Sequence, residues 1–441
     1  MYDKMKFDKP NVAIIGFGTM GRYTAEALSP KVKSFFINDS KYVRDKDITL
    51  RNPTTFKLLD WEFKGYLKHA DIAIFCTPTD QVEQSMQTYL PFLKNGTFVT
   101  GQTSRKTPES KTFDLFRCRR PDLEMVSLHT MCNPAKSDPT KEILGLIRHH
   151  ASDETYAWAR GFFGDMSEHI EEFASVEEHD TMTANTQINT SRTNLSIASS
   201  FAEAGCFPWV EGAYGSGLDV MKFSLAMRTA SLKDHVYRGI QFGSEYGKEL
   251  VSKAVEVEND LYGMILANQR DEYAARVIEI KNALFGEKER EPILRDEEVA
   301  QFSIGEESKP NSHSSLIQWA GGLVANGINP FEHLKATTPN YTALLLLTDY
   351  VFNRKELLRE SVHAPFDHPQ LRQEDLVFHS QSRGWSDALL FDNVQGYNSR
   401  HKQMTDKLEQ LDVSDYVEKS KDVTRVCREA LARERDRVMI H

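Results

Sequence analysis

The chain has 441 residues, of which 40% are hydrophobic and 27% charged, and its formal net charge is −10 at pH 7. The length predicts about two to four domains, and the composition is that of an ordinary globular protein. Because nucleic acids and anionic membrane surfaces are themselves negatively charged, the acidic balance argues against binding to either.

The cysteines and the apolar runs exclude further classes of protein. The five cysteines are scattered and form no CxxC pair, so we expect neither a disulfide framework nor a zinc site. The N-terminal residues lack the long apolar core of a signal peptide, and no apolar run approaches the ~20 residues of a membrane span. We therefore expect a cytoplasmic protein that holds no metal.

Short apolar runs alternate with helical segments in the N-terminal part of the chain. The apolar, mostly β-branched runs lie at 12–15, 34–37, 72–76, 97–100 and 125–128, and helical spacing marks 20–28 and 81–90 between them. Such alternation predicts a parallel sheet with helices on both faces. We expect an α/β Rossmann dinucleotide-binding domain over residues 1–170.

The pattern changes near Ser175, where Ser175 and Glu178 fit a helix-capping box. The remaining chain, residues 171–441, predicts an all-α substrate and dimerisation domain. The expected helices cover 176–205, 218–243, 245–285, 312–326 and 340–358, with a loop at 212–217 and a polar linker at 289–310. The charged C-terminal segment from Tyr416 predicts a solvated terminal helix.

A dinucleotide fingerprint, NVAIIGFGTMG, occupies residues 11–21. Gly16, Gly18 and Gly21 form GxGxxG between the first expected strand and the first expected helix, with Thr19 and Met20 in its last gap. These glycines allow a tight turn, close approach of a pyrophosphate, and close packing of helix on strand. The helix N-terminus would then bind the phosphates, so we expect a nicotinamide dinucleotide cofactor.

Asp39 ends the second expected strand, about 20 residues after the last glycine, where an acid binds the adenosine ribose of NAD. However, Ser40, Lys41 and Arg44 follow at once, and residues of these kinds hold the 2′-phosphate of NADP. The residues alone leave the choice open; we take NADP as the expected cofactor and NAD as the alternative.

Further polar residues follow the expected strands. Thr77 and Pro78 come after the run at 72–76, Ser104 and Lys106 after the run at 97–100, and His129 after the run at 125–128. The carboxyl ends of parallel strands face the ligand crevice, so we expect Thr77 and Pro78 beside the cofactor and Lys106 beside the substrate. A histidine there can act as a general base, because its pKa lies near neutral pH.

Several segments together carry a resemblance to a known family. They are IIGFGTMG, GQTSRK, SLHTM, EEHD followed by TQ, and an arginine before a tyrosine, and then PNSHSSL and GINPFEH. Over about residues 10–355 their order and spacing resemble the prephenate dehydrogenase family, and the last two segments resemble its fungal branch. The resemblance implies oxidative decarboxylation of prephenate to 4-hydroxyphenylpyruvate in tyrosine biosynthesis.

The resemblance implies a role for individual residues. His129 would take the proton of the substrate's ring hydroxyl as hydride leaves the same carbon, and Ser104 would position that hydroxyl. Arg228, which precedes Tyr237 in the sequence, would bind a substrate carboxylate, and Gln187 would face the site. The family also implies a homodimer that pairs through the helical domain, with regulation by tyrosine but no separate regulatory domain in this sequence.

Two positions qualify the resemblance. His179 of EEHD is expected to have a structural, domain-joining role. Ser191 stands where many family members carry a second, substrate-binding histidine. Arg192 could supply the missing charge, although neighbours on a helix point about 100° apart. Arogenate dehydrogenase is therefore an alternative, and Ser191 is the first residue to examine for it.

Two interpretations from other classes also remain. A hydroxyacid dehydrogenase of the same architecture would use a lysine of the helical domain, for which Lys222 is the candidate; activity without release of CO2 would favour it. A non-catalytic dinucleotide-binding sensor would bind cofactor tightly and turn over no cyclohexadienyl substrate.

Overall fold

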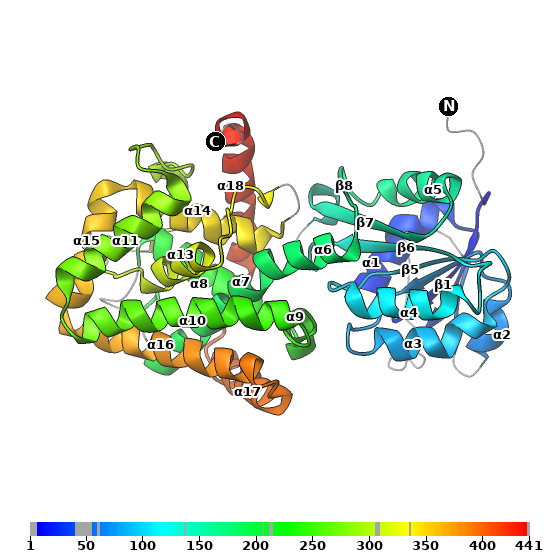
Figure 1. Cartoon of the computed structure of the whole chain (residues 1–441), viewed down its shortest axis with the longest axis horizontal. Helices are drawn as coiled ribbons and strands as arrows, with labels where there is room; N and C mark the ends of the chain where they lie inside the picture. Colours follow the sequence, from blue (N-terminus) through cyan, green and yellow to red (C-terminus); the bar gives the residue numbers. More distant parts are fainter. Residues whose placement is uncertain are drawn as a thin grey trace. The chain divides into compact units, whose positions relative to one another are not determined.

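The computed structural model describes residues 7–39, 55–59, 62–135, 138–205, 207–210, 215–304, 309–334 and 337–438. The chain folds into two compact units, Met1–Thr183 and Ala184–His441 (Figure 1). The boundary expected from the sequence, at residue 170, falls before the helix α6 (Val176–Thr183), which belongs to the first unit.

The first unit is built on a sheet of eight strands in the order β3-β2-β1-β4-β5-β6-β7-β8. Strands β1 to β6 are mutually parallel, which confirms the Rossmann-type sheet expected from the sequence. The expectation of a wholly parallel sheet is wrong at one edge, because β7 runs antiparallel to β6 and β8 runs parallel to β7. The strands are β1 (Asn11–Ile15), β2 (Ser34–Asn38), β3 (Thr55–Leu58), β4 (Ile72–Phe75), β5 (Phe98–Gly101), β6 (Glu124–Thr130), β7 (Ile143–His150) and β8 (His169–Phe173).

Helices cover both faces of this sheet, as its apolar strands require. Alternate residues of β1 enter different cores: Val12 and Ile14 pack with α1 (Thr19–Leu28) and α5 (Asp153–Gly164), on one face. Ala13 and Ile15 pack on the other face with α2 (Phe63–Leu67), α3 (Val82–Tyr89) and α4 (Thr107–Arg117). Figure 1 shows α3 and α4 along one side of the sheet and α5 along the other.

The second unit is helical in its described residues, which confirms the all-α character expected from the sequence. It begins with a π-helical turn (Ala184–Ile188) that leads into α7. Its helices are α7 (Asn189–Ala204), α8 (Gly217–Ala230), α9 (Asp234–Gln241), α10 (Glu245–Leu266), α11 (Arg270–Phe285), α12 (Asp296–Ala300), α13 (Ser314–Ala325), α14 (Pro339–Asn353), α15 (Lys355–Asp367), α16 (Pro369–Leu390), α17 (Val394–Glu409) and α18 (Ser414–Val438).

Two long helices expected from the sequence are each divided in the structure. The segment 218–243 is interrupted between α8 and α9, and the segment 245–285 is interrupted between α10 and α11. The second interruption contains Asn268, whose φ is +56°. Asparagine adopts this left-handed conformation more readily than most residues, and the conformation ends a right-handed helix.

The terminal helix α18 is present as expected, but it is not simply solvated. Val423, Cys427 and Ala430 on α18 are fully buried, and the helix packs against α8 and α14. Their i, i+4, i+7 spacing gives the charged helix one apolar face. Among helices of the described ranges, none combines the length and apolar character that crossing a bilayer requires.

Candidate active site

The glycine turn lies between β1 and α1, and packing explains two of its glycines. Gly16 has φ +91°, and a Cβ atom there would lie 2.7 Å from the Cys76 carbonyl oxygen. A Cβ at Gly21 would overlap the Gly16 carbonyl. Gly18 differs, because no heavy atom lies within 4 Å of its Cβ position and it caps α1 without a side-chain hydrogen bond. The turn thus leaves open space at a helix N-terminus, which suits a phosphate.

The residues around this turn suit a dinucleotide. Asp39, directly after β2, accepts a 2.7 Å hydrogen bond from the Phe17 backbone N–H. Thr77, which follows β4, has a buried Oγ1 with no hydrogen-bond partner among the described residues. Thr19 and Met20 form the first turn of α1, and Pro78 follows Thr77. The other expected cofactor residues, Ser40 and Lys41 with neighbouring Arg44, lie outside the described residues.

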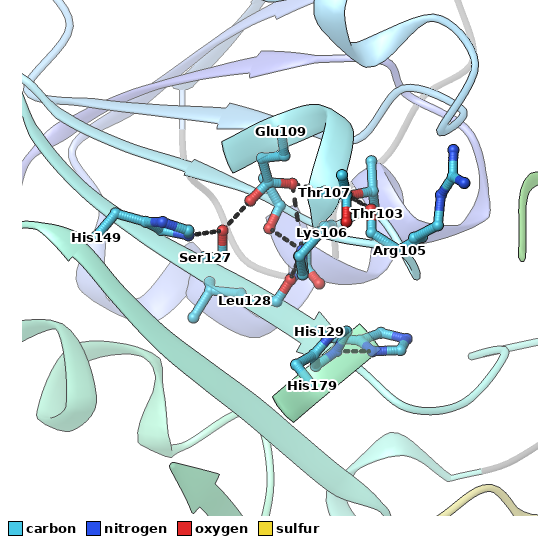
Figure 2. Close-up of polar contacts among 12 residues, drawn as sticks. Thr103, Arg105, Lys106, Thr107, Glu109, Ser127, Leu128, His129, His149 and His179 are labelled. Carbon is cyan, nitrogen blue, oxygen red and sulfur yellow. Dashed lines mark hydrogen bonds and ion pairs between the residues drawn. The ribbon is translucent and has the colours of Figure 1, made fainter. Parts of the chain in front are cut away.

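His129 lies near the carboxyl end of β6 and is almost entirely buried. Its Nδ1 is 2.8 Å from Nε2 of His179 on α6, and His179 Nδ1 is 2.8 Å from Oδ1 of Asp180 (Figure 2). Asp180 accepts hydrogen bonds from the backbone N–H groups of Lys106, at 2.7 Å, and Thr107, at 2.8 Å. A continuous set of hydrogen bonds therefore joins the start of α4 to the imidazole of His129.

These contacts determine where the protons lie. A carboxylate only accepts hydrogen bonds, so the Nδ1 atom of His179 carries its proton and its Nε2 is an acceptor. His129 must then donate from Nδ1, which leaves a lone pair on its Nε2. No described residue makes a hydrogen bond to His129 Nε2. This nitrogen can accept a proton from a ligand.

The surroundings favour the neutral form of both imidazoles. Burial lowers the pKa of His129 well below its ordinary value, and the nearby His179 and Lys106 lower it further. Burial also lowers the pKa of His179, although the hydrogen bond to Asp180 opposes this shift. Burial would raise the pKa of Asp180, but its hydrogen bonds, first among them that from His179, hold the pKa below its usual value. At neutral pH the site therefore holds an unprotonated histidine beside a carboxylate.

The expected role of Lys106 in substrate binding does not agree with its position. Its side chain is fully buried, and Nζ donates to the Gly101 carbonyl at 3.1 Å, to Glu109 Oε2 at 3.2 Å and to the Leu128 carbonyl. An ammonium has three N–H groups, so all are used inside the first unit. Ser104, two residues earlier on the turn between β5 and α4, is half-buried.

Ser191 and Arg192 both point into the helical core of the second unit. The Ser191 hydroxyl donates to the Gln187 carbonyl at 2.6 Å and accepts from Gln241 at 2.8 Å. Arg192 is 1% exposed and forms an ion pair with Glu258. Arg192 therefore does not supply the charge of the missing histidine, and Ser191 offers only a hydroxyl that its own helix already binds.

The other expected substrate residues are also buried in the second unit. Gln187 lies on the π-helical turn before α7. Such turns interrupt the α-helical ladder and are frequent at functional sites. Arg228 on α8 lies close enough to Tyr237 on α9 that its charge lowers the pKa of that phenol, against a larger opposing effect of burial. The arginine and tyrosine noted in the sequence are therefore neighbours.

Sequence reasoning missed the contribution of His179 and Asp180 to the surroundings of His129. It assigned His179 a domain-joining role, whereas the imidazole contacts His129 directly. The available signal was the adjacency of a histidine and an aspartate in EEHD. That adjacency resembles the base-and-orienter pairing of catalytic triads, but 50 residues separate His129 from His179 in sequence.

Known proteins resemble the chain over most of its length. It is 27% identical over 397 residues to "Probable prephenate dehydrogenase [NADP(+)]" of Schizosaccharomyces pombe, covering 88% of this chain and 91% of that protein. It is 26% identical over 404 residues to "Prephenate dehydrogenase [NADP(+)]" of Saccharomyces cerevisiae, covering 88% of each. A solved prephenate dehydrogenase from A. aeolicus, bound to hydroxyphenyl propionate and NAD+, is 17% identical with a TM-score of 0.46, over 63% of this chain and 97% of that one.

A family model matches the helical unit itself. Residues 189–424, which are more than half of the chain and run from the start of α7 into α18, match the model of the 6-phosphogluconate dehydrogenase C-terminal domain. Together with the Rossmann-type first unit and its glycine turn, this match shows that the chain belongs to the family defined by the 6-phosphogluconate dehydrogenase C-terminal domain.

Proposed function

We propose that this protein is an NADP-dependent prephenate dehydrogenase, which converts prephenate to 4-hydroxyphenylpyruvate and CO2. The observation that carries the proposal is the free Nε2 lone pair of His129, held by His179 and Asp180 at the same sheet edge as the glycine turn. The two fungal relatives, whose names give this reaction and NADP, support the choice of substrate and cofactor.

The reaction requires a base at the ring hydroxyl. The hydride leaves the carbon that bears the hydroxyl, and the bound nicotinamide accepts it. His129 takes the hydroxyl proton as the carbon–oxygen double bond forms. The bond to the ring carboxylate then breaks, its electron pair enters the ring, CO2 leaves, and the proton returns to the oxygen as the phenol forms. A positioned base of this kind contributes roughly 10²–10⁴-fold to the rate.

His179 and Asp180 would support His129 as it accepts the proton. When Nε2 of His129 is protonated, the imidazolium donates from Nδ1 to His179, whose other nitrogen donates to Asp180. The carboxylate stabilises the positive charge and keeps both rings in the required tautomers, as the aspartate does in a serine protease triad. We therefore assign His179 and Asp180 an orienting role.

Substrate contacts follow from the sequence resemblance and stay proposals. Arg228 is our candidate for a substrate carboxylate, where a charge-assisted hydrogen bond contributes about 1.5–3 kcal/mol. Ser104 is the candidate for the ring hydroxyl and Gln187 for a further polar contact. Because neither Ser191 nor Arg192 offers a free cation, the group that distinguishes prephenate from arogenate would be recognised elsewhere.

The direct test measures reduction of NAD and of NADP with prephenate and, separately, with arogenate. We expect the fastest reduction with prephenate and NADP, with 4-hydroxyphenylpyruvate identified as product by mass spectrometry. Reduction with arogenate alone would keep the mechanism and change the substrate. Absence of reduction in all four mixtures would refute the proposal and favour a dinucleotide sensor.

We also propose that the protein is a cytoplasmic homodimer. The support is the helical unit, which leaves large apolar side chains exposed, among them Phe391 at 77% and Leu266 at 60%. Exposed apolar groups of this size mark association surfaces more often than random positions do. Light scattering should give a mass near twice the 50.4 kDa of one chain. A mass equal to one chain would refute the dimer.

A further inference from the structure

A buried ion pair lies in the first unit next to the residues that hold His129. Lys106 and Glu109 are both fully buried, with Nζ and Oε2 3.2 Å apart (Figure 2). Lys106 precedes α4 and Glu109 lies on its first turn. Burying two charges costs free energy that their attraction often fails to recover, and apolar residues at such positions are frequently as stable or more so. Stability alone therefore does not account for the pair.

The surrounding hydrogen bonds all direct donors at Glu109. Ser127 Oγ on β6 donates to Glu109 Oε1, and Thr103 Oγ1 lies 2.8 Å from Oε2. His149 Nε2 on β7 is 2.8 Å from Ser127 Oγ, and because the Ser127 proton is directed at Glu109, His149 is the donor in that contact. A carboxylate with this set of donors is an anion that neutralises the Lys106 ammonium. A side chain on Gly101 would overlap this carboxylate.

Lys106 contacts the His129 assembly at two separate points. Its ammonium donates to the Leu128 carbonyl, which belongs to the peptide bond that joins Leu128 to His129. Its backbone N–H donates to Asp180 Oδ1, the atom that also accepts from His179. One residue thus fixes the main chain beneath His129 and the far end of the hydrogen bonds that orient its imidazole.

We propose that Lys106, neutralised by Glu109, is a positioning residue that sets the orientation and the basicity of the His129 imidazole. This inference rests on the proposed role of His129 as a base. It replaces the substrate-binding role expected for Lys106 from the sequence, because the ammonium has no N–H left for a ligand.

The charges around His129 predict the sign of the effect. Within the first unit, α6 contributes His179 and Asp180, the start of α4 contributes Lys106 and Glu109, and β7 contributes His149 at the far side of Ser127. The positive charge of Lys106 lowers the pKa of His129. Removing that charge should raise the pKa, so that a higher pH is needed to reach the unprotonated base.

The experiment compares Lys106→Met, Glu109→Gln and the double variant in kcat and in its pH profile. For Lys106→Met we expect kcat to fall about tenfold or more, since small errors in positioning a reacting group have effects of this size. The acid limb of the profile should move to higher pH. Glu109→Gln leaves the ammonium without its counter-charge, so its acid limb should move to lower pH. The double variant should lie between them.

A second readout does not depend on turnover. Protein labelled with 13C at histidine Cε1 gives a titration curve for each imidazole by NMR, and His129→Asn identifies the signal of His129. Lys106→Met should raise the titration midpoint of His129, whereas NADP affinity and the melting temperature serve as controls for folding. This measurement still tests the inference if no substrate is found.

Unchanged pH profiles and an unchanged His129 titration in both single variants would overturn the proposal, even if kcat falls, because a merely structural residue would behave in this way. If Lys106→Met does not fold, Glu109→Gln decides: a shift to lower pH supports the proposal, and an unshifted profile overturns it.

Discussion

At the scale of single residues, proton positions in the site follow from a few contacts. The carboxylate of Asp180 determines the tautomer of His179, and His179 in turn determines that of His129. Each step is an elementary consequence of which atoms can donate. The result is a neutral imidazole whose one lone pair is available to a ligand, which is what a general base requires.

His129→Asn tests this assignment directly. Asparagine keeps polar atoms near the Nδ1 position but has no group that accepts a proton at neutral pH. We expect kcat to fall by about 10²-fold or more while NADP affinity, measured by fluorescence titration, stays within a factor of about two. A variant that retains more than about a tenth of the wild-type kcat would show that His129 is not the base.

At the scale of elements, the turn between β1 and α1 separates structural from functional glycines. Gly16 and Gly21 lie against backbone atoms, whereas Gly18 faces open space. The same motif therefore contains positions at which a side chain would disturb folding and one at which it would meet only a ligand. The distinction cannot be read from the pattern GxGxxG, which treats the three alike.

A matched pair of alanine variants should reveal the difference. Gly21→Ala would force its methyl group into the Gly16 carbonyl, so we expect a clear fall in melting temperature. Gly18→Ala should keep the wild-type melting temperature and weaken NADP binding about tenfold or more, because the methyl group occupies the approach of the pyrophosphate. Gly65→Ala on α2, where a Cβ also meets open space, is the control. Equal NADP affinities for Gly18→Ala and Gly65→Ala would contradict the prediction.

The start of α13 carries a second titratable element. His313 caps this helix with φ +46°, is buried, and has its pKa lowered to about 4, mainly by burial. The unfolded chain, in which histidine has its ordinary value of 6.5, therefore binds a proton that the folded chain does not between pH 6.5 and 4. The free energy of unfolding should fall as pH drops through this window, by at most about 3 kcal/mol from this residue.

His313→Asn removes the titration and keeps a residue that tolerates positive φ. Urea unfolding at pH 7 and pH 4.5 should show a smaller loss of stability for the variant than for the wild type. The same loss in both proteins would mean that His313 does not contribute to the acid sensitivity.

At the scale of the whole molecule, buried charges join segments that are far apart in sequence. Arg192 on α7 pairs with Glu258 on α10 and donates to Ser382 and Ser386 on α16. All of these side chains are nearly or completely buried. Such a group holds three helices of the second unit in one arrangement, and this accounts for Arg192 without any contact to substrate.

Arg192→Met should therefore destabilise the protein by about 3–5 kcal/mol, because it leaves Glu258 buried without its partner. The double variant Arg192→Met/Glu258→Gln should recover most of this loss in urea unfolding. If Arg192→Met retains wild-type stability but loses affinity for substrate, Arg192 serves the site after all and the structural explanation is wrong.

Much of the first unit could be predicted from local sequence. All five apolar runs are strands, and the GxGxxG motif lies where a strand meets a helix, because burial on both faces and the needs of a tight turn leave clear local patterns. The strands β3, β7 and β8 were not predicted. Strand β7, which reads ILGLIRHH, has the composition of a strand but no local feature that specifies its antiparallel direction.

The sequence by itself determined the Rossmann-type sheet, the dinucleotide turn, the helical second unit and the identity of His129 as a candidate base. Tertiary structure decided what each polar side chain contacts: His179 turns toward His129, Lys106 toward Glu109, and Arg192 toward Glu258. The physical reason is range. Backbone conformation follows from neighbouring residues, whereas the partner of a buried charge is selected by packing between segments that lie 50 or more residues apart, as His129–His179 and Arg192–Glu258 do.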